Sequence, residues 1–543
     1  MDGLMMDYEL VVPKILQRAA RVFPEKEIVC ELGGHTIRSD YAELYRRVVR
    51  LANVLRKLGV QRGDRVATFA WNHHRHLELY FAVPAMGAVL HTVNLRLSTE
   101  QLRYIVNHAE DRVMFVDDSL LAPIEAQAAE FPSIRQYVVM TESGRMPETS
   151  LSPAAEYEAL MAEADEREDF PELQEREACG LCYTSGTTGD PKGVLYSHRA
   201  IYLHTMMACM TDVLGFSERD VVLPIVPMFH ANAWGTPYNC AMMGAKLVFA
   251  GSNVQPDHIV HLIERERVTL AMGVPTIWTN LLQYLEQNPA DLSSLRAMVV
   301  GGSAVPRSMI ETFRNKYGVL IIQGWGMTEM SPLGTAGRLT KKMEDWTEAR
   351  QLDVLAKAGQ LAPNVEAKLI GDDGEELPWD GKSVGELLVR GPCVARGYYN
   401  NPEAAEAFTE DGWFRTGDVA AIDEYAMLTI SDRTKDLIKS GGEWISSVEM
   451  ENVIMACPGV MEAAVVARPD EKWDERPLAY VVRAEGGAEA TPEAIVEALA
   501  RTFAKWQLPA AEDIRFIDAI PKTGVGKFDK KVLRAMLRES AGG

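Results

Sequence analysis

Apolar residues recur in two alternating patterns through most of the first 330 residues. Residues 42–59 carry apolar side chains at helical spacing and end at Gly59, which predicts an amphipathic helix. Residues 65–70, 221–226 and 245–250 are apolar runs of strand length. Alternation of helices with buried strands is typical of α/β layers built on mostly parallel sheets.

The pattern changes twice in the second half of the chain. Between residues 359 and 430, short apolar runs separated by glycines and acidic turns predict a β-rich region. Residues 432–442 are charged and end in two glycines, as expected of an interdomain hinge. A compact pattern follows, with a helix near residues 448–456 and strands near 463–466 and 479–482. We therefore expect an α/β protein with a large N-terminal domain of layered, mostly parallel sheets plus a β-rich subdomain (1–432), a hinge linker (433–438) and a small mobile α+β C-terminal domain (439–543).

Chain length and net charge restrict the architecture and the partners. A chain of 543 residues is too long for one hydrophobic core, so at least two domains are expected. The 56 basic and 77 acidic residues leave a net charge of −21, which disfavours nucleic acid and anionic membrane surfaces as partners. An anionic substrate therefore needs a local positive pocket.

We expect a cytoplasmic protein without stable membrane insertion. The first nine residues contain acids where a signal peptide needs a basic segment. The most apolar segment, residues 79–93, contains Pro84 and His91 and is too short to span a bilayer, so we interpret it as a buried core helix. Seven cysteines, mostly among apolar neighbours, suit a reducing compartment.

Two clusters have the residue types of a redox or metal site but lack its partners. Cys179 and Cys182 form a CxxC pattern in an apolar strand without a second cysteine pair, so we interpret them as core cysteines. His73, His74 and His76 have no Glu or Cys at ligand spacing, so we interpret them as loop and helix-start residues.

The loop 183–193 carries the strongest chemical signal. Its sequence, Tyr-Thr-Ser-Gly-Thr-Thr-Gly-Asp-Pro-Lys-Gly, lies between a predicted buried strand and a helix that begins near His198. Glycines beside hydroxyls let backbone N–H groups form an anion-binding nest, so the loop predicts polyphosphate binding. The P-loop motif does not fit, because Gly193 rather than Ser or Thr follows Lys192 and the glycine spacing differs. A flexible surface turn is the alternative.

Further segments add the chemistry of a nucleotide site. Glu329 follows a Gly-Trp-Gly segment whose ring could stack on a purine, and its carboxylate suits Mg²⁺. Asp418 could accept both ribose hydroxyls, although Thr-Gly-Asp is also ordinary turn chemistry. His230 and Trp234 taken alone are more often packed core residues, and Lys527 alone would be a surface lysine. Their joint occurrence, in this order, favours a nucleotide site.

Together these motifs resemble the adenylate-forming superfamily of acyl-CoA synthetases, luciferases and peptide-synthetase adenylation domains. The resemblance covers nearly the whole chain, through motifs for phosphate (183–193), adenine and magnesium (324–329), ribose (398–418), hinge (432–451) and catalytic lysine (521–527). Trp325 stands where the family usually has tyrosine. The hinge motif and residues 227–234 are especially similar to the fatty acyl-CoA synthetase branch.

The resemblance implies a two-step ligase that uses ATP and coenzyme A. A carboxylate attacks the α-phosphate of ATP to give acyl-AMP and pyrophosphate, and coenzyme A thiolate then displaces AMP. Mg²⁺ would be held through Glu329 and Thr184, and Lys527 would stabilise the developing charge. The C-terminal domain would rotate about Lys435 between the steps, which withdraws Lys527 and opens a tunnel for coenzyme A.

When the functional residues of the family are carried over position by position, the resemblance implies the following site residues. The catalytic residues are Lys527, Glu329, Thr184 and His230. The ATP and AMP contacts are Thr184, Ser185, Gly186, Thr187, Thr188, Lys192, Gly302, Gln323, Gly324, Trp325, Thr328, Asp418, Arg433, Lys435, Lys439 and Trp444. The acyl pocket and its gate are Trp234, His230, Val274, Pro275 and Ile277. The remaining assignments are Gly441 and Gly442 for coenzyme A, Lys435 for the hinge, and Thr184 and Glu329 for the metal.

The residue types of the acyl-pocket segments indicate an apolar acid. No Arg or Lys occurs in residues 229–238, 273–278 or 301–304, which disfavours dicarboxylates and amino acids because a second charge would need a buried partner. The apolar side chains from Val274 to Trp278 fit an aliphatic chain. We expect a medium-chain fatty acid; a long-chain fatty acid and a short thioether acid such as 3-methylthiopropionate are the alternatives.

More remote alternatives share the adenylation step. A carrier-protein-loading adenylation enzyme is disfavoured because the chain stops sixteen residues after Lys527 and its pocket lacks an obvious acid for an amino group. A luciferase-like oxygenase is left open by the motifs. A non-catalytic relative is disfavoured because Lys527 and Glu329 are both present. The resemblance also implies a homodimer, since related fatty acyl-CoA synthetases often pair through their N-terminal domains.

Overall fold

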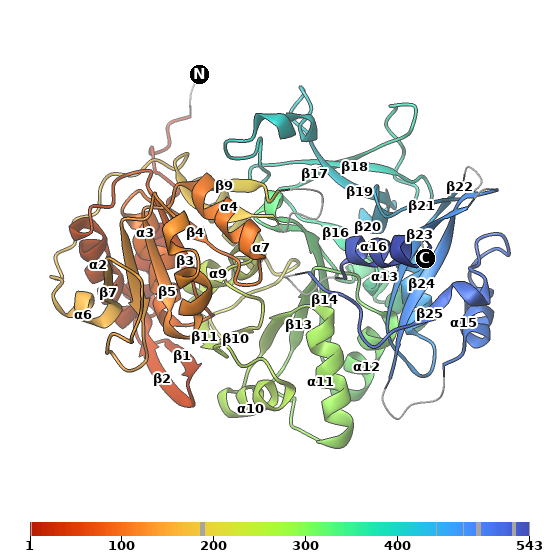
Figure 1. Cartoon of the computed structure of the whole chain (residues 1–543), viewed down its shortest axis with the longest axis horizontal. Coiled ribbons are helices and arrows are strands. Elements are labelled where there is room, and N and C mark those ends of the chain that lie inside the picture. The colour runs from red at the N-terminus through yellow and green to blue at the C-terminus, as the bar shows by residue number, and fades with distance from the viewer. Residues whose placement is uncertain are drawn as a thin grey trace.

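The computed structural model describes residues 1, 3–184, 190–440, 443–470, 472–484, 490–523 and 528–541. Two large sheets with their helices form an N-terminal body, and a smaller lobe follows at the C-terminal end of the chain (Figure 1).

Within the described residues the first sheet holds seven strands, of which six run parallel. Their order is β7 (Ala154–Glu156), β6 (Gln136–Met140), β5 (Val113–Asp117), β3 (Arg65–Phe69), β4 (Val89–Thr92), β8 (Ala178–Tyr183) and β9 (Gly193–Ser197). Strand β9 is antiparallel to β8 and lies at the edge. Strands β3 and β5 are apolar and buried almost throughout, as expected for a parallel sheet covered by helices on both faces.

The second sheet, thirteen strands in the described part of the chain, joins a parallel half to an antiparallel half. Its order is β17 (Glu366–Ile370), β18 (Gly385–Arg390), β19 (Phe414–Ile422), β20 (Met427–Arg433), β16 (Gly359–Leu361), β15 (Leu333–Ala336), β14 (Leu320–Gly326), β13 (Ala297–Gly301), β12 (Leu270–Gly273), β10 (Val221–Pro224), β11 (Lys246–Phe249), β1 (Glu27–Leu32) and β2 (His35–Asp40). The change occurs at β14, which is parallel to β13 and antiparallel to β15. At the far edge of the parallel half, β2 is antiparallel to β1.

Helices bury the faces of both sheets. They are α1 (Val12–Val22), α2 (Tyr41–Lys57), α3 (His74–Ala85), α4 (Thr99–Ala109), α5 (Leu121–Glu125), α6 (Tyr157–Ala162), α7 (His198–Cys209), α9 (Thr236–Met243), α10 (Pro256–Glu266), α11 (Pro275–Gln287), α12 (Arg307–Tyr317) and α13 (Glu348–Leu355). The short element α8 (Ala231–Trp234) has positive φ angles and is a left-handed turn. Helix α2 begins where Asp40 accepts the Glu43 N–H, and it buries an apolar face. Val66 of β3 and Leu247 of β11 share one core, so common helices hold the two sheets together.

The C-terminal lobe has its own sheet and core. The strands run in the order β22 (Glu443–Ile445), β21 (Ile438–Ser440), β24 (Asp474–Arg483) and β23 (Val460–Asp470), and β25 (Ile514–Phe516) adds parallel to β24. Its helices are α14 (Ser447–Met455), α15 (Pro492–Leu499) and α16 (Lys530–Ala541). Ile454, Val465 and Leu499 are fully buried in its core.

The structure confirms the α/β fold class and most of the predicted elements. The helix predicted over residues 42–59 is α2, and the strands predicted at 65–70, 221–226 and 245–250 are β3, β10 and β11. The β-rich region at 359–430 is formed by β16 to β20. No helix in the described ranges has both the length and the apolar composition needed to cross a bilayer.

The prediction of one buried helix over residues 79–93 is wrong. Helix α3 ends at Ala85, Gly87 takes a φ of 71°, and β4 begins at Val89. A left-handed residue turns the chain at little cost when it is glycine, so the helix and the strand both enter the core. Because both elements are buried, the apolar run continues across their boundary and hides it.

Candidate active site

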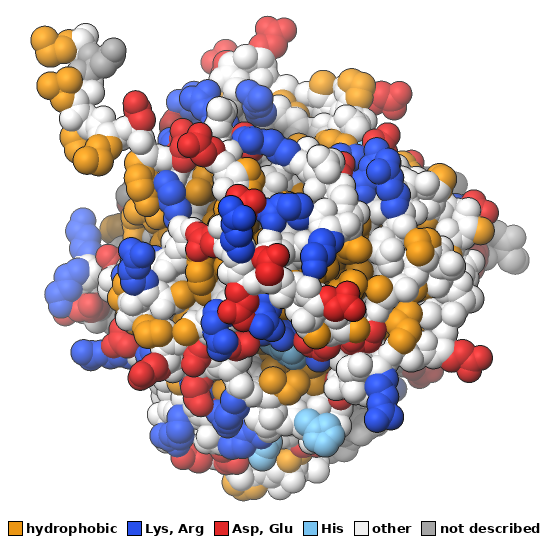
Figure 2. Space-filling view, turned by 90° about the vertical axis from the view of Figure 1, so that its left-hand side faces the viewer, with side chains coloured by type: hydrophobic (Ala, Val, Ile, Leu, Met, Phe, Trp, Pro, Cys, Tyr) orange, Lys and Arg blue, Asp and Glu red, His pale blue; other side chains and the backbone are white. Residues whose placement is uncertain are grey.

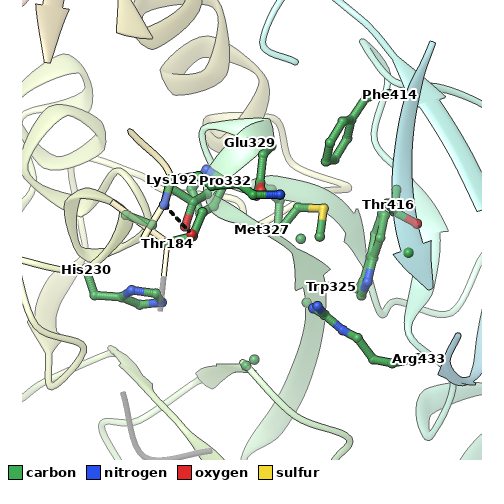
Figure 3. Close-up of a pocket in the computed structure, with 18 of the residues that line it drawn as sticks. Thr184, Lys192, His230, Trp325, Met327, Glu329, Pro332, Phe414, Thr416 and Arg433 are labelled. Carbon is green, nitrogen blue, oxygen red and sulfur yellow. Dashed lines mark hydrogen bonds between the residues drawn. The ribbon is translucent and has the colours of Figure 1, made fainter. Parts of the chain in front are cut away.

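A cavity of about 360 Å³ lies where the two halves of the thirteen-stranded sheet meet. One wall contains the carboxyl ends of β13 and β14, at Gly301 and Gly326. Another part of the wall is formed by β19 and residues 433–435. Figure 3 shows His230 and Arg433 on opposite sides of the view. The carboxyl ends of parallel strands are the usual ligand-binding edge of an open α/β sheet.

The two ends of the predicted phosphate loop, residues 183–193, are joined at this cavity. The Thr184 hydroxyl accepts a hydrogen bond from the Lys192 N–H at 3.1 Å, and the Thr184 N–H donates to the Lys192 carbonyl at 3.0 Å (Figure 3). The loop connects antiparallel strands, β8 and β9, whereas a P-loop connects a strand to a helix. Four of the predicted phosphate contacts lie outside the described residues: Ser185, Gly186, Thr187 and Thr188.

Glu329 stands beside the phosphate loop, in the short turn after β14. Its Oε1 accepts a hydrogen bond from the Tyr398 hydroxyl at 2.7 Å. Burial and the neighbouring Glu329 carboxylate raise the pKa of Tyr398, so the hydroxyl remains a proton donor. Lys192 Nζ lies 5.0 Å from the centre of the Tyr398 ring. Tyr398 thus contacts both the carboxylate and the cation of the loop.

The donor atoms at this end of the cavity fit a magnesium ion. Glu329 provides a carboxylate and Thr184 a hydroxyl, and both line the cavity. Mg²⁺ takes one or two carboxylates and completes its octahedron with phosphate oxygens and water. Among the described residues there is no cluster of three or more His, Cys, Asp or Glu side chains able to hold a metal ion. A metal here would therefore need oxygens from the substrate.

Trp325, which lines the cavity, bonds Asp418, which is buried outside the lining, although 93 residues separate them in sequence. The Trp325 indole N–H donates to Asp418 Oδ2 at 2.7 Å, and Arg433 Nε lies 2.9 Å from Asp418 Oδ1. A Cβ added to Gly334 would lie 2.6 Å from Cζ3 of the indole, so glycine is needed there. Two donors therefore hold the buried Asp418 carboxylate in place.

Among the other predicted nucleotide contacts, Gly302, Gly324 and Thr328 line the cavity. Gln323 does not belong to the lining: its side chain is buried and Oε1 accepts the Val305 N–H at 3.0 Å. It positions the segment that follows β13 instead of facing the cavity.

Lys435, the predicted hinge residue, and the hairpin after it lie in different surroundings. Lys435 lines the cavity, and burial lowers its pKa. Lys439 on β21 and Trp444 on β22 are not in the cavity lining; Lys439 Nζ lies 5.4 Å from the Trp444 ring centre, and Trp444 is 45% exposed. Three further predicted residues lie outside the described residues: Gly441, Gly442 and Lys527.

The structure divides the predicted acyl-pocket residues into two groups. Trp234 and His230 line the cavity, and the Trp234 ring packs against Gly301, where an added Cβ would lie 3.4 Å from Cη2. Trp278 is fully buried and donates its indole N–H to the Gly273 carbonyl at 3.2 Å, so it is a core residue. Three others lie at the start of α11, outside the cavity lining: Val274, Pro275 and Ile277.

Sequence reasoning missed several residues that line the cavity. The apolar ones are Leu214, Val299 and Leu333, and the polar ones include Asp190, Arg415 and Thr416. Apolar side chains carry no functional signature of their own. Val299 was nevertheless identifiable, because residues two apart on a strand share a face and Gly301 was already assigned to the site.

Cations outnumber acids around the cavity. Among its lining residues the basic ones are Lys192, Arg415, Arg433 and Lys435, and the acidic ones are Asp190 and Glu329. A local excess of positive charge attracts an anionic ligand despite the net charge of −21 on the chain.

The cysteine and histidine clusters are structural. Cys179 and Cys182 are buried in β8, and burial raises the pKa of Cys182 to about 11, so it stays a thiol. At the start of α3, His73 bonds the Asp117 carboxylate at 2.8 Å. Both interpretations from the sequence are confirmed.

Two family models match the chain. One, described as AMP-binding enzyme, matches residues 16–399. The other, described as AMP-binding enzyme C-terminal domain, matches residues 449–527.

Relatives of known activity are similar over nearly their whole lengths. The chain is 49% identical to a long-chain-fatty-acid–CoA ligase of Thermus thermophilus, with 99% of this chain and 98% of the relative covered. It is 44% identical to a medium-chain-fatty-acid–CoA ligase of Ectopseudomonas oleovorans (98% and 97% covered) and 44% identical to a 3-methylmercaptopropionyl-CoA ligase of Ruegeria lacuscaerulensis (100% of both). A crystal structure of an anthranilate CoA ligase in complex with anthranoyl-AMP superimposes with a TM-score of 0.88 at 25% identity, with both chains fully covered.

Proposed function

Because the chain belongs to the AMP-binding enzyme family and is an ATP-dependent acid–CoA ligase, we propose that its substrate is a medium-chain fatty acid. The observation that carries this proposal is the apolar part of the cavity wall, formed by Leu214, Val299, Leu333 and Trp234. These side chains offer an acid no second charge to pair with. They favour an aliphatic chain over a dicarboxylate or an amino acid.

Cavity size favours a medium chain over a long one. The cavity volume of about 360 Å³ is at the small end of small-molecule sites, which span about 300–1,000 Å³, and this cavity must also hold the nucleotide. A long-chain acid is the second candidate, supported by the relative that is 49% identical. A thioether acid such as 3-methylthiopropionate is the third, supported by the relative that acts on 3-methylmercaptopropionate.

We propose that acyl-AMP forms between the phosphate loop and the Trp234 side of the cavity. A carboxylate oxygen of the acid bonds to the α-phosphorus while the bond from that phosphorus to the bridging oxygen breaks, which releases pyrophosphate. Asp418 accepts the ribose hydroxyls, Trp325 stacks on the adenine, and Lys192 and Lys527 stabilise phosphate charge. Mg²⁺ held through Glu329 and Thr184 would supply further neutralisation of the triphosphate.

The second step exchanges AMP for coenzyme A. The thiolate sulfur bonds to the acyl carbon while the bond from that carbon to the phosphate oxygen breaks, and AMP leaves. His230 lines the cavity next to the turn that carries Trp234, where it can orient the acyl carboxyl in both steps. We propose that rotation about Lys435 brings Gly441 and Gly442 to the thiol path, with Lys439 and Trp444 joining the site in one of the two arrangements.

The acid preference is tested by initial rates of coenzyme A thioester formation with straight-chain acids of two to eighteen carbons and with 3-methylthiopropionate. We expect the highest kcat/KM with acids of about six to twelve carbons. A maximum at sixteen or eighteen carbons would establish the long-chain alternative. A maximum at the thioether acid would establish the third candidate.

We also propose that the protein is a cytoplasmic homodimer. Residues 3–8 form an arm that projects from the start of the chain, and Leu4, Met5 and Met6 are almost fully exposed (Figures 1 and 2). Exposed apolar side chains in one place mark a protein contact. All seven cysteines are unpaired thiols, which supports a reducing compartment. Sedimentation of the full chain and of a variant lacking residues 1–8 tests the dimer; a monomeric full chain would contradict it.

A further inference from the structure

Five consecutive residues before α9 adopt a left-handed backbone. The φ angles of Ala231, Asn232, Ala233, Trp234 and Gly235 are 42°, 57°, 47°, 56° and 81°. Left-handed geometry brings the Cβ of an L-residue close to the following carbonyl oxygen, so such residues normally occur singly. Elsewhere in the described ranges, each non-glycine residue with positive φ stands alone in the sequence. This left-handed turn, residues 231–235, is therefore a concentration of backbone strain.

Buried contacts hold the left-handed turn in this conformation. The Thr236 hydroxyl donates to the Ala233 carbonyl at 2.6 Å, and the Gly235 N–H donates to the Asn232 carbonyl at 2.9 Å. A Cβ added to Gly235 would lie 3.0 Å from the His204 ring, so the turn is also closely packed. Strained backbone persists only where surrounding contacts determine it in this way, and it is concentrated at functional sites.

A polar group next to the left-handed turn lacks partners in this conformation. Asn239 on α9 is fully buried, and neither its amide oxygen nor its amide nitrogen has a hydrogen-bond partner among the described residues. Its Nδ2 would lie 3.6 Å from a Cβ on Gly235. Most buried side-chain amides are paired, so a rearranged turn that offers Asn239 a backbone partner would be favoured by this bond.

The side chain that the left-handed turn positions is Trp234. Its neighbours Asn232 and Ala233 are buried and outside the cavity lining, whereas Ala231 and Trp234 line the cavity, and the Trp234 ring lies against Gly301. Gly301 ends β13, and the neighbouring strand β12 ends at Gly273, next to the start of α11. The indole therefore lies at the carboxyl end of β13, one strand away from the end of β12. A change in the turn's backbone would move the indole away from Gly301.

We propose that the left-handed turn is a strained hinge that lowers the cost of moving Trp234 and so determines which acids the enzyme admits. The inference rests on the proposed fatty-acid substrate. The turn is strained while the indole lies against Gly301, and the strain is released when the indole moves. This release reduces the binding energy that the acid must supply to displace the indole. Long acids depend most on this release because they need the most space.

Glycine substitutions test the hinge directly. Ala231→Gly and Ala233→Gly remove the steric cost of the left-handed conformation and leave Trp234 in place, so they stabilise the closed arrangement. We expect the KM for fatty acids to rise about fivefold or more, with the largest rise for the longest acids. The KM for ATP should change less than about twofold.

Ala426→Gly is the matched control. Ala426 has a φ of 60°, stands alone in the β19–β20 turn and does not line the cavity. The same chemical change there relieves the same kind of strain away from the site. It should raise the melting temperature by about 2 °C and leave the acid KM unaltered.

A double-mutant cycle completes the test. In a Trp234→Ala background, where no indole blocks the cavity, Ala233→Gly should have no effect on the acid KM. Equal acid KM values in wild type and both glycine variants would overturn the inference, and so would an increase that persists without the indole. A wild-type chain that activates no fatty acid would instead contradict the proposed function, so the two failures are distinguishable.

Discussion

Trp325 is where this chain departs from the usual tyrosine of its family, and its indole N–H bonds the carboxylate of Asp418 at 2.7 Å. A tyrosine ring carries no donor at the position of an indole nitrogen. Together with Arg433, the indole fixes both oxygens of the acid proposed to bind the ribose. Trp325, the proposed purine platform, and Asp418, the proposed ribose acceptor, are therefore one hydrogen-bonded unit.

Trp325→Phe removes this donor and keeps an aromatic ring. We expect the KM for ATP to rise about tenfold, because a hydrogen bond to a charged group contributes about 1.5–3 kcal/mol, while the KM for the acid stays the same. Steady-state kinetics with each substrate varied provides the measurement. Trp379→Phe, at a partly exposed position outside the cavity lining, is the control. An unchanged KM for ATP would show that the bond has no role in nucleotide binding.

Lys527→Ala tests the residue expected to stabilise charge at the α-phosphate. We expect acyl-AMP formation to fall by about 10² to 10³, the loss typical of removing one electrostatic stabiliser, and thioester formation from supplied acyl-AMP to be retained. Lys522→Ala is the control, because Lys522 lies nearby in sequence and pairs with Glu462 at 2.6 Å. Equal losses in the two half-reactions would rule out a role confined to adenylation.

Motif resemblance identified polar site residues better than apolar ones. Glu329 and Thr184, which line the cavity, were predictable because carboxylates and hydroxyls beside glycines are uncommon combinations with defined chemistry. Asp418 was predicted in the same way and is buried outside the lining. Leu214 and Leu333 could not be found, because any apolar residue near a strand looks like a core residue in the sequence. The bond between Trp325 and Asp418 depends on β14 and β19 facing each other across the cavity, which no local pattern contains.

Strand β20 and helix α14 form the junction between the N-terminal body and the C-terminal lobe. Asp432 near the end of β20 accepts the Ser447 N–H at 2.7 Å, and Lys530 of α16 bonds Glu451 at 2.7 Å. Burial alone would lower the pKa of Lys530, but Glu451 and Asp432 raise it, so the lysine remains charged. Residues 433–438 therefore connect the N-terminal body to the C-terminal lobe, and buried polar contacts hold the chain on both sides of this segment.

Lys435→Pro restricts that connection. Proline fixes φ near −65° and removes an N–H, which opposes a large rotation about this residue. We expect thioester formation to fall about tenfold or more and acyl-AMP formation to change little. Separate assays of the two half-reactions provide the measurement. Lys435→Ala separates the loss of the side chain from the restriction of the backbone, and equal effects of Pro on both half-reactions would contradict a hinge at this position.

Element boundaries were predictable where turn residues mark them and hidden where they do not. Helix α2 has Asp40 at its start and Gly59 just beyond its end, and its prediction is confirmed. The boundary between α3 and β4 lies within one apolar run, so periodicity alone did not reveal it. Strand β9 was missed because it is short and directly precedes α7.

Buried histidines make the whole molecule sensitive to acid. Burial lowers the pKa of His204 to about 4 and that of His76 to about 3. His204 Nε2 accepts the Leu333 N–H at 3.2 Å, which requires a neutral ring. Because these folded-state values lie below the unfolded value of about 6.5, their contribution to stability is complete above pH 6.5 and is lost as pH falls toward 4.

We expect the free energy of unfolding to fall by about 2 kcal/mol for each of these histidines between pH 7.5 and pH 5. Urea unfolding at the two pH values provides the measurement. His204→Gln keeps a hydrogen-bonding side chain without a titrating ring and should reduce the loss. An unfolding midpoint that does not change with pH would show that these rings are not held neutral.

The whole molecule places a positive cavity inside an acidic protein. The motifs for phosphate, adenine and ribose come from both large sheets and are brought together where the parallel and antiparallel halves of the second sheet meet. The order of the elements along the chain predicted the layers. It did not predict that thirteen strands continue as one sheet, because strand neighbours distant in sequence leave no local pattern.

The central claim is that this cavity joins a fatty acid to coenzyme A through an acyl-adenylate. The most direct measurement is product analysis with ATP and octanoate, with and without coenzyme A. We expect one AMP and one pyrophosphate for each octanoyl-CoA when coenzyme A is present, and enzyme-bound octanoyl-AMP with pyrophosphate when it is absent. Formation of ADP and phosphate, or release of pyrophosphate that does not depend on any carboxylic acid, would contradict the account.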